Sequence, residues 1–343
     1  MRIFLKYILS IYFIFLIYES GSAQDIHFSQ ISEVPIIRNP ALAGIFTGDV
    51  RVQAIYRNQW SSVSVPFQTA MLNGEYKFPV GDGNDFMTIG GIIFHDQAGS
   101  AALTTTQVKP VINFHKSLSS ERNMYLSAGF SGGLVQRSVD RSKMITDGQY
   151  GPGGYDPSLN NGETFSNGSF MYFDGSAGLT FNMQVGDNQD DNIYIGAAYH
   201  HFNKSAKVSF YNSPDVRQIP KIVLSAGVRL NVYESAFITF YGDFSKQGPS
   251  KELTAGLLYS WKLDDETNPK YIVSLGGFIR WEDAIIPMIK METMPFTFAV
   301  SYDVNVSRLK TASQSRGGFE LSLSYQKFLD RSKSLETLRC PKF

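Results

Sequence analysis

The chain has 343 residues, and its 31 Lys and Arg balance 31 Asp and Glu, so the formal net charge is zero. A nucleic-acid-binding protein needs a basic excess, so no nucleic-acid partner is expected. Hydrophobic residues make up 43% and charged residues 18% of the chain, which excludes disorder as its main state. Cys340 is the single cysteine, so an intrachain disulfide framework and a cysteine-built zinc site are excluded as well.

The N-terminus has the features of an export signal. Two basic residues precede an uncharged run from Tyr7 to Tyr18, and small residues follow at 21–23, as a signal peptidase requires. We therefore expect residues 1–23 to be a signal peptide and Gln24 to be the first mature residue. A retained membrane anchor is the alternative, but a run of about 12 apolar residues is shorter than the ~20 that span a bilayer.

From residue 49 onward, apolar residues alternate with small or polar residues, as they do in a strand with two different faces. In the segment 222–232, for example, every even-numbered residue is aliphatic and most odd-numbered residues are small or polar. The pattern predicts about fourteen strands, at 49–58, 67–78, 86–96, 104–115, 122–135, 168–183, 192–203, 219–232, 235–245, 250–262, 270–281, 284–292, 295–305 and 316–328.

The predicted strands are long. Strands of soluble proteins average ~5 to 6 residues, whereas a tilted strand that crosses a membrane needs ~9 to 11, and most of the predicted strands reach that length. Several also end in aromatic residues, as the interfacial girdles of membrane barrels do. The sequence therefore predicts an all-β fold, a transmembrane antiparallel β-barrel of about 14 strands over residues 49–328.

The lengths of the connections predict how the barrel is oriented. The long connections, 136–167, 204–218 and 306–315, are all odd-numbered in chain order, so they lie at one end of the barrel. Outer-membrane barrels have long loops outside and short turns in the periplasm. We expect a protein of the Gram-negative outer membrane with both termini in the periplasm. Pro287 weakens the prediction of the twelfth strand, 284–292, because proline removes a ladder donor.

The lumen is expected to have free space. Fourteen strands enclose more than the ~8 strands of a barrel filled by its own side chains, and inward-facing residues such as Gly129 and Gly196 are small. Water, a plug or a partner segment would occupy that space. The segment 24–48 is a candidate plug or a periplasmic segment, because Pro35 and Pro40 prevent it from forming a strand.

Four short motifs give the chain a resemblance to a known family. They are QDIHFSQ at 24–30, RNPALAG at 38–44, YRNQW at 56–60 and CPKF at the end of the sequence. In this order they resemble the PorP/SprF family of type IX secretion membrane proteins. The resemblance implies an outer-membrane β-barrel of the Bacteroidetes type IX secretion and gliding motility machinery. It also implies a non-enzymatic accessory that binds translocon subunits, periplasmic ring subunits or a large exported surface adhesin and helps its export or anchoring.

The candidate partner-binding residues come from these motifs. Each motif also has an interpretation without a partner. The N-terminal motifs could only position the first strand, the tryptophan could be a rim anchor, and the tail cysteine could be unpaired. A free periplasmic thiol is also suited to an intermolecular disulfide. Deleting the predicted periplasmic tail, 329–343, is expected to weaken partner recruitment while the barrel still assembles. The candidates are His27, Phe28, Ser29, Gln30, Asn39, Pro40, Arg57, Trp60, Cys340, Pro341 and Phe343.

No catalytic, cofactor or metal site is predicted. His200 and His201 are adjacent, so on a strand they would face opposite sides and could not hold one ion. The acidic loop 137–167 lacks the residue spacing of a calcium-binding loop. His27 and Ser29 could form the base and nucleophile of an outer-membrane lipase, but the sequence places no third, orienting carboxylate beside them.

A transporter is the alternative function. Long-chain fatty-acid channels also combine fourteen strands with an N-terminal hatch, so a chain of this design could carry a small hydrophobic ligand. Outer-membrane lipid would surround the barrel in either case. Ligand flux that depends on the plug would favour transport over a role in secretion.

Overall fold

The computed structural model describes residues 25–61, 65–81, 83–163, 167–186, 188, 190–205, 208–211, 216–265, 269–307 and 310–329. The predicted signal peptide at 1–23 and the tail residues Cys340, Pro341 and Phe343 lie outside the described residues. Within them, no helix is long and apolar enough to cross a membrane.

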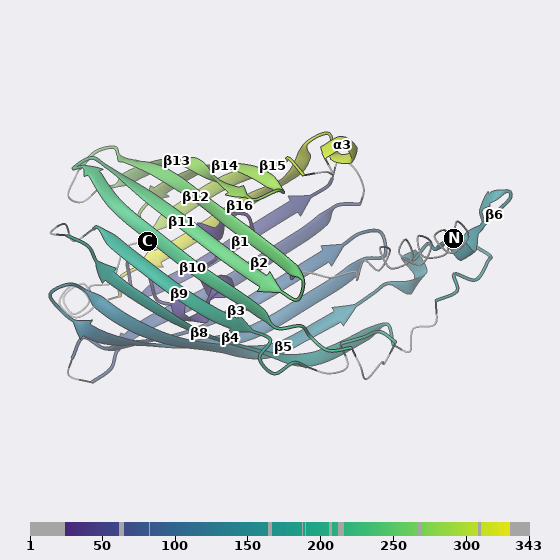
Figure 1. Cartoon of the computed structure of the whole chain (residues 1–343), viewed down its shortest axis with the longest axis horizontal. Coiled ribbons are helices and arrows are strands. Elements are labelled where there is room, and N and C mark those ends of the chain that lie inside the picture. The colour runs from purple at the N-terminus through teal and green to yellow at the C-terminus, as the bar shows by residue number, and fades with distance from the viewer. Residues whose placement is uncertain are drawn as a thin grey trace, which may run out of the picture.

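The long strands form one closed antiparallel barrel (Figure 1). Closure is what hydrocarbon demands, since it cannot satisfy the backbone groups of an open sheet edge. The predicted fold class is therefore confirmed. The barrel strands are β1 (Val50–Gln59), β2 (Phe67–Pro79), β3 (Phe86–Ala98), β4 (Leu103–Ser119), β5 (Met124–Ser138), β8 (Ser169–Gln184), β9 (Asn192–His200), β10 (Lys221–Tyr233), β11 (Ala236–Gln247), β12 (Ser250–Lys262), β13 (Tyr271–Arg280), β14 (Ala284–Thr293), β15 (Phe296–Asn305) and β16 (Arg316–Lys327).

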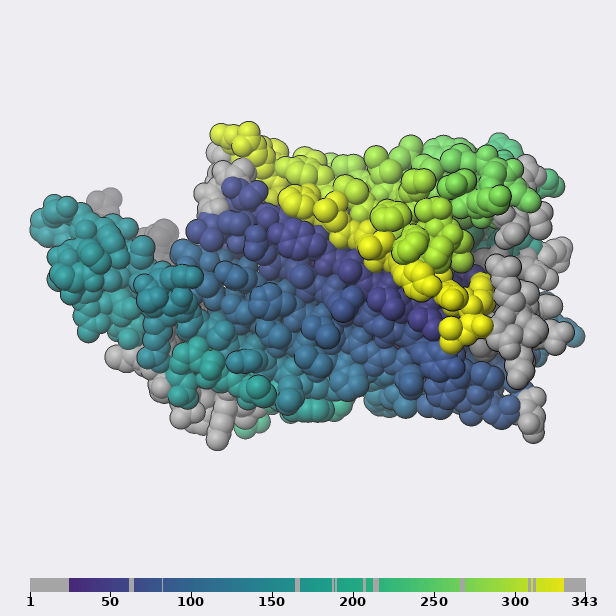
Figure 2. All heavy atoms as spheres, turned by 180° about the vertical axis from the view of Figure 1, so that it is seen from behind, coloured from purple at the N-terminus to yellow at the C-terminus, as the bar shows by residue number. Residues whose placement is uncertain are grey.

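The first and last strands close the barrel. β1 pairs with β16 along its whole length, from Val50 opposite Lys327 to Gln59 opposite Gly318. Figure 2 shows this seam as the tilted purple and yellow strands lying side by side. On the other side β1 pairs with β2, so neither edge of the first strand is left unpaired.

The two ends of the barrel differ. The odd-numbered connections form the long-loop end, where the hairpin β6 (Tyr150–Gly151) and β7 (Gly154–Tyr155) projects far beyond the rim and α3 (Lys310–Ser313) precedes β16 (Figure 1). The even-numbered connections form the short-turn end, where β1 begins and β16 ends. Outward-facing aromatic residues mark both rims, with Tyr76, Trp261 and Tyr325 near the short-turn end and Trp60, Tyr199 and Trp281 near the long-loop end.

Proline interrupts the hydrogen-bond ladder without ending a strand. β14 contains Pro287, and its pairing with β15 skips Ile286 and Pro287, while its pairing with β13 continues through Gly277 opposite Pro287. Proline keeps its carbonyl acceptor and loses a single donor, so one side of the strand can stay paired. The predicted twelfth strand therefore forms.

A disulfide across the seam should form without distortion. Ala54 lies directly opposite Leu323 on the outer face, and paired positions of antiparallel strands lie within disulfide reach. In a Cys340→Ser background, Ala54→Cys with Leu323→Cys should crosslink on oxidation and change the mobility of the unfolded chain in a denaturing gel. The control pair Ala54→Cys with Leu275→Cys, on β1 and β13, should stay reduced. Crosslinking of the control pair, or none at the seam, would contradict the closed topology.

Candidate functional site

The N-terminal segment crosses the barrel lumen from one end to the other. Asp25 contacts His201 and Gln247 at the long-loop end, whereas the Asp49 N–H donates to the Lys327 carbonyl at the short-turn end. Between them the chain forms three short helices, η1 (Ile31–Glu33), α2 (Pro35–Arg38) and η2 (Pro40–Leu42). We call residues 25–48 the plug. Its placement inside the lumen makes the contacts between plug and wall the candidate functional site.

Apolar side chains of the plug face apolar patches on the lumen wall. Phe28, Val34 and Ile36 form one buried cluster with wall residues that include Phe94. Ile31 belongs to a second cluster, which lines β11 to β15. The alternating pattern predicts a lumen wall of small and polar residues. The wall is instead apolar where the plug covers it.

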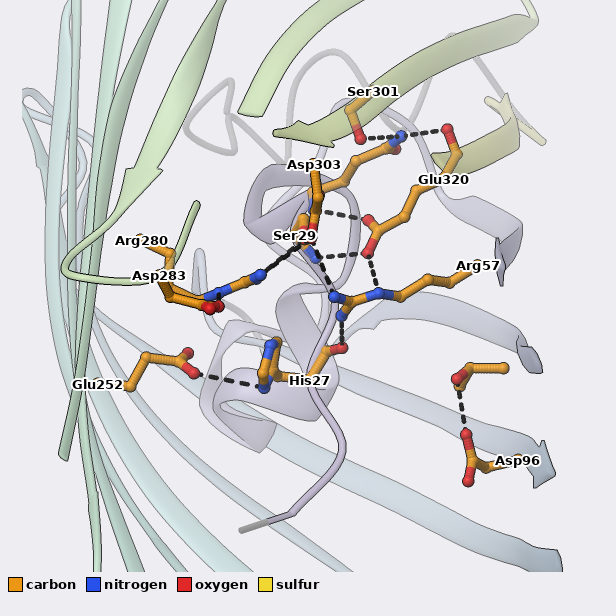
Figure 3. Close-up of polar contacts among 12 residues, drawn as sticks. His27, Ser29, Arg57, Asp96, Glu252, Arg280, Asp283, Ser301, Asp303 and Glu320 are labelled. Carbon is orange, nitrogen blue, oxygen red and sulfur yellow. Dashed lines mark hydrogen bonds and ion pairs between the residues drawn. The ribbon is translucent and has the colours of Figure 1, made fainter. Parts of the chain in front are cut away.

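A charged cluster fixes the start of the plug (Figure 3). The backbone N–H groups of Ser29 and Gln30 donate to the two carboxylate oxygens of Glu320, at 2.7 and 2.8 Å. The Ser29 hydroxyl donates to Asp303 Oδ2 at 2.7 Å, and the Gln30 amide donates to Ser301 Oγ at 3.1 Å. The wall therefore recognises the backbone of this segment as well as its side chains.

Two arginines balance the two carboxylates of this cluster. Arg57 Nη2 lies 3.0 Å from Asp303 Oδ2, and its Nε lies 3.2 Å from Glu320 Oε1. Arg280 Nη2 lies 2.9 Å from Asp303 Oδ2. Arg57 also donates to the His27 carbonyl of the plug. All four charged side chains are at most 5% exposed, so removing one partner leaves an uncompensated buried charge.

An arginine of the plug forms the next attachment. Arg38 makes a two-pronged contact with Asp243 on β11, and it also donates to the Ile31 carbonyl at 2.8 Å and to the Tyr194 hydroxyl at 3.1 Å. The Arg38 carbonyl accepts a bond from His200 Nε2 at 3.0 Å. The planar guanidinium suits such a bidentate contact, which fixes direction as well as distance.

The motif from Asn39 to Gly44 packs directly against glycines of the wall. The side chain of Asn39 caps η2 by accepting from the Ala41 N–H at 2.8 Å. A Cβ on Gly178 would lie 1.9 Å from Asn39 Oδ1, and a Cβ on Gly129 would lie 2.4 Å from the Pro40 carbonyl carbon. The small inward residues of the wall therefore hold this motif and do not leave open space.

Polar wall residues also bind the plug between Ala41 and Gly44. Asn113 donates to the carbonyls of Ala41 and Ala43, both at 2.8 Å. The Gly44 N–H donates to Glu75 at 2.7 Å, and Glu75 pairs with Arg51 at 2.6 Å. Because Gly44 has a φ of +85°, the left-handed region, this turn favours glycine.

A histidine between two carboxylates holds the first plug residue. His201 Nε2 donates to Asp25 Oδ2 at 2.6 Å, and its Nδ1 donates to Asp174 Oδ1 at 2.7 Å. Burial opposes the charged imidazolium, but the bonds to Asp174 and Asp25 outweigh it and raise the pKa of His201 to about 9. His201 is therefore positively charged at neutral pH, and it links the plug to the connection that follows β9.

The two adjacent histidines do not face opposite sides. β9 ends at His200, three residues earlier than expected, because His201 adopts a left-handed φ of +59°. This conformation turns both rings into the lumen, where they have different partners, so the expectation of opposite faces is wrong. Among the described residues, no group of three His, Cys, Asp or Glu could hold a metal ion.

The structure brings most of the predicted site residues into the lumen. Phe28, Ser29, Gln30, Asn39, Pro40 and Arg57 are all buried there, and His27 is half-buried with its Nδ1 3.3 Å from Glu252. Burial, Arg280 and Arg57 lower the pKa of His27, so its ring is neutral. Trp60 lies at the rim, stacked on Phe67. Partner binding by these residues stays a prediction, since they contact the barrel itself.

Sequence reasoning missed the wall partners of the plug. Asp243, Asp303 and Glu320 stand at inward positions of the alternating pattern, and a carboxylate among small residues on that face was the available signal. Ser29 donates to Asp303 while His27 faces Glu252. This arrangement gives no support to a pairing of His27 and Ser29 as base and nucleophile.

Adding one methyl group at Gly178 should release the middle of the plug. We expect Gly178→Ala to raise the rate of tryptic cleavage after Arg38 by about tenfold, because overpacking costs ~1 to 3 kcal/mol and cleavage follows the population of the opened state. The rate is read by mass spectrometry of digests of the folded protein. The control Gly74→Ala adds the same group where no atom lies within 4 Å and should behave as wild type. Equal rates in all three proteins would contradict the close packing.

Removing the carboxylate that binds the plug backbone should loosen its start. Glu320→Ala leaves Arg57 underpaired and the N–H groups of Ser29 and Gln30 without an acceptor, a loss of about 3 kcal/mol. Hydrogen exchange in residues 27–31 should then be about 100-fold faster. The exposed Glu121→Ala serves as the control. Unchanged protection in Glu320→Ala would refute the attachment.

Alkaline pH should free the first plug residues. The folded pKa of His201, about 9, lies above its ordinary value of 6.5, so its contribution to stability is complete below about pH 6.5 and is lost as pH rises through about 9. A nitroxide at Ile26→Cys in the Cys340→Ser background should gain mobility between pH 7 and pH 10, measured by electron paramagnetic resonance. With His201→Gln added, the label should be mobile at both pH values. A pH response that persists in that variant would exclude His201 as its source.

Comparisons with known proteins agree with this fold. The model of the family described as type IX secretion system membrane protein PorP/SprF matches residues 20–325. No curated protein matches the chain. Solved structures that resemble it are outer-membrane barrels: a mutant of the TodX monoaromatic hydrocarbon channel, with 11% identity, 87% of this chain and 94% of that chain covered and a TM-score of 0.50, and a Pseudomonas aeruginosa FadL homologue, with 11% identity, coverages of 84% and 92% and a TM-score of 0.49.

The translocator domain of the autotransporter NalP from Neisseria meningitidis is also similar, with 10% identity, coverages of 81% and 88% and a TM-score of 0.43. At such identities, likeness in structure bears on the fold alone. The family model covers most of the sequence and includes the motifs that form the plug. The chain belongs to the PorP/SprF family of type IX secretion system membrane proteins.

Proposed function

We propose that the protein is a non-enzymatic accessory of type IX secretion that binds a translocon subunit, a periplasmic ring subunit or an exported adhesin. Membership of the family makes the chain a type IX secretion component, and together with the barrel fold it supports an outer-membrane location. The plug carries the rest of the proposal. The plug fills the lumen and is attached to the wall through ion pairs and hydrogen bonds. The two ends of the barrel are therefore the surfaces that other macromolecules can bind.

The long-loop end offers a projecting surface. The rings of Tyr150 and Tyr155 at the tip of the β6–β7 hairpin lie 5.6 Å apart and are 59% and 45% exposed. Aromatic side chains on a short hairpin are common anchors of protein interfaces. We propose that this end faces the cell exterior, where an exported adhesin would meet it.

The residue that follows the plug meets the end of β16 at the short-turn end, whereas Asp25, the first described residue, lies at the long-loop end. Asp49, which directly follows the plug, donates through its N–H to the Lys327 carbonyl and accepts a bond from the Leu329 N–H at 2.8 Å. We propose that this end faces the periplasm. A periplasmic subunit could then reach the base of the plug and the C-terminal tail at one place.

Transport of a small hydrophobic ligand is the second candidate function, favoured by the likeness of the fold to the TodX channel. Two features weigh against it. The wall around the mouth carries charged residues such as Lys109, Arg137 and Asp174, and passage would require the buried ion pairs of the plug to break together. Breaking one such pair costs ~3 to 5 kcal/mol.

Partner recruitment should depend on the C-terminal tail. Crosslinked affinity purification of the tagged protein from native outer membranes should recover secretion subunits or a large adhesin. A chain that ends at Leu329, which keeps the bond to Asp49, should recover about fivefold less, equivalent to about 1 kcal/mol of binding free energy. Cys340→Ser tests whether the thiol is responsible, and heat-modified gel mobility verifies that each barrel is folded.

An unrelated outer-membrane barrel with the same tag provides the background. Recovery of the barrel alone would argue against the secretion role, and ligand uptake into liposomes by the wild-type protein would then favour transport. Equal recovery by the full and shortened chains would remove the tail from the binding surface and leave the long-loop end to be tested.

A further inference from the structure

We propose that the long-loop mouth of the barrel contains a binding site for an organic carboxylate with an apolar body. A cavity of about 380 Å³ lies there, between the first plug residues and the inner wall of strands β3 to β12. This volume is within the range of ~300 to 1,000 Å³ that ligand pockets occupy. The site goes beyond the proposed role in secretion and does not depend on it.

The carboxylates that line the cavity already have partners. Asp25 contacts His201, and Asp174 contacts both His201 and Lys109. Asp243 pairs with Arg38, and Glu252 faces the neutral His27. A cationic ligand would therefore have to compete with His201, Lys109 and Arg38 for three of these carboxylates and with the His27 ring for Glu252.

Two cations on the wall strands of the same cavity have no such partner, and the exposed Arg217, in the connection after β9, is a third cation in its lining. Neither Arg137 on β5 nor Lys221 on β10 makes an ion pair or a side-chain hydrogen bond with another described residue, and both line the cavity. The Nε atom of Arg137 is buried and without an acceptor. A buried donor that lacks an acceptor costs ~1 to 3 kcal/mol, and a ligand carboxylate would remove that cost through a charge-assisted bond.

The rest of the cavity suits an apolar group. Phe28 of the plug and Phe94, Val135 and Val223 of the wall line it together with the charged residues. The lining thus combines many charged and polar side chains with an apolar patch, and convergent polar groups beside apolar side chains can orient a small molecule. We therefore assign the carboxylate to the side of Arg137 or Lys221 and the apolar body to these four side chains.

The plug closes the cavity on the side away from the mouth. Phe28 and Ile31 line it, and Ser29 and Gln30, which lie between them in the sequence, are bonded to Glu320 on the wall. A ligand that enters from the long-loop end thus meets the start of the plug. When bound, the ligand would contact His27 and Phe28, and it would not have to pass through the barrel.

The test measures binding to the full-length protein in lipid nanodiscs by calorimetry. One probe is 4-phenylbutyrate, with its uncharged amide as the matched control. A second pair is a short peptide that ends in phenylalanine, with a free or an amidated C-terminus. We expect saturable binding of at least one free acid and an affinity for its amide lower by at least about tenfold, since the amide has no charge for the cations to bind.

Variants of the two cations show which of them binds the carboxylate of the ligand. Arg137→Gln and Lys221→Gln should each lower the affinity for the free acid, with a drop of at least about tenfold in one of them, and leave the affinity for the amide unchanged. Lys246→Gln removes an equivalent charge from the outer face of β11 at the same end and should bind as wild type. Heat-modified gel mobility shows whether each variant is folded, and two cation variants keep the test valid if one is not.

The outcomes separate the ligand sources. Binding of phenylbutyrate alone would identify a small amphiphile, and binding of the peptide acid alone would identify a peptide C-terminus; either result supports the site. The proposal is overturned if neither acid binds saturably. It is also overturned if each amide binds as tightly as its acid, or if Arg137→Gln and Lys221→Gln bind as wild type does.

Discussion

The lumen wall carries buried carboxylates that need partners, and the structure inside the barrel depends on how their charges are compensated. Asp303 and Glu320 pair with Arg57 and Arg280 of nearby strands on the inner wall, yet Glu320 also needs the backbone N–H groups of Ser29 and Gln30. Buried ion pairs are tolerated when hydrogen bonds satisfy the remaining oxygens. The plug supplies those bonds, so plug and wall are stable together and less stable apart.

This dependence explains the RNPALAG motif in physical terms. Arg38 reaches Asp243, and Asn39 turns the chain by capping the next helix while it fills the space over Gly178. Proline prevents the segment from adding a strand to the wall, and Gly44 permits the turn toward β1. The motif is therefore the part of the sequence that converts a hollow barrel into a filled one.

Much of the fold could be predicted because each strand of the barrel is recognisable from the pattern of its own residues. Alternation with period two sets the faces of each strand, and the turns separate one strand from the next. The plug was harder to place, since its contacts join residues hundreds of positions apart: Ser29 with Asp303, or Arg38 with Asp243. The inward carboxylates could be seen in the sequence, but which plug group each one binds could not. His201 shows the same limit, because its left-handed conformation ended β9 early and turned its side chain into the lumen together with that of His200.

A filled lumen separates this barrel from an open channel, and it moves the expected function to the two ends. The most direct measurement is the ion conductance of the purified protein in planar lipid bilayers, with an open porin as the positive control for insertion. Our account predicts that inserted wild-type barrels carry no steady current, because the plug is bonded to the wall along the length of the lumen. A stable conductance comparable to that of the porin would contradict it and would make transport the leading function.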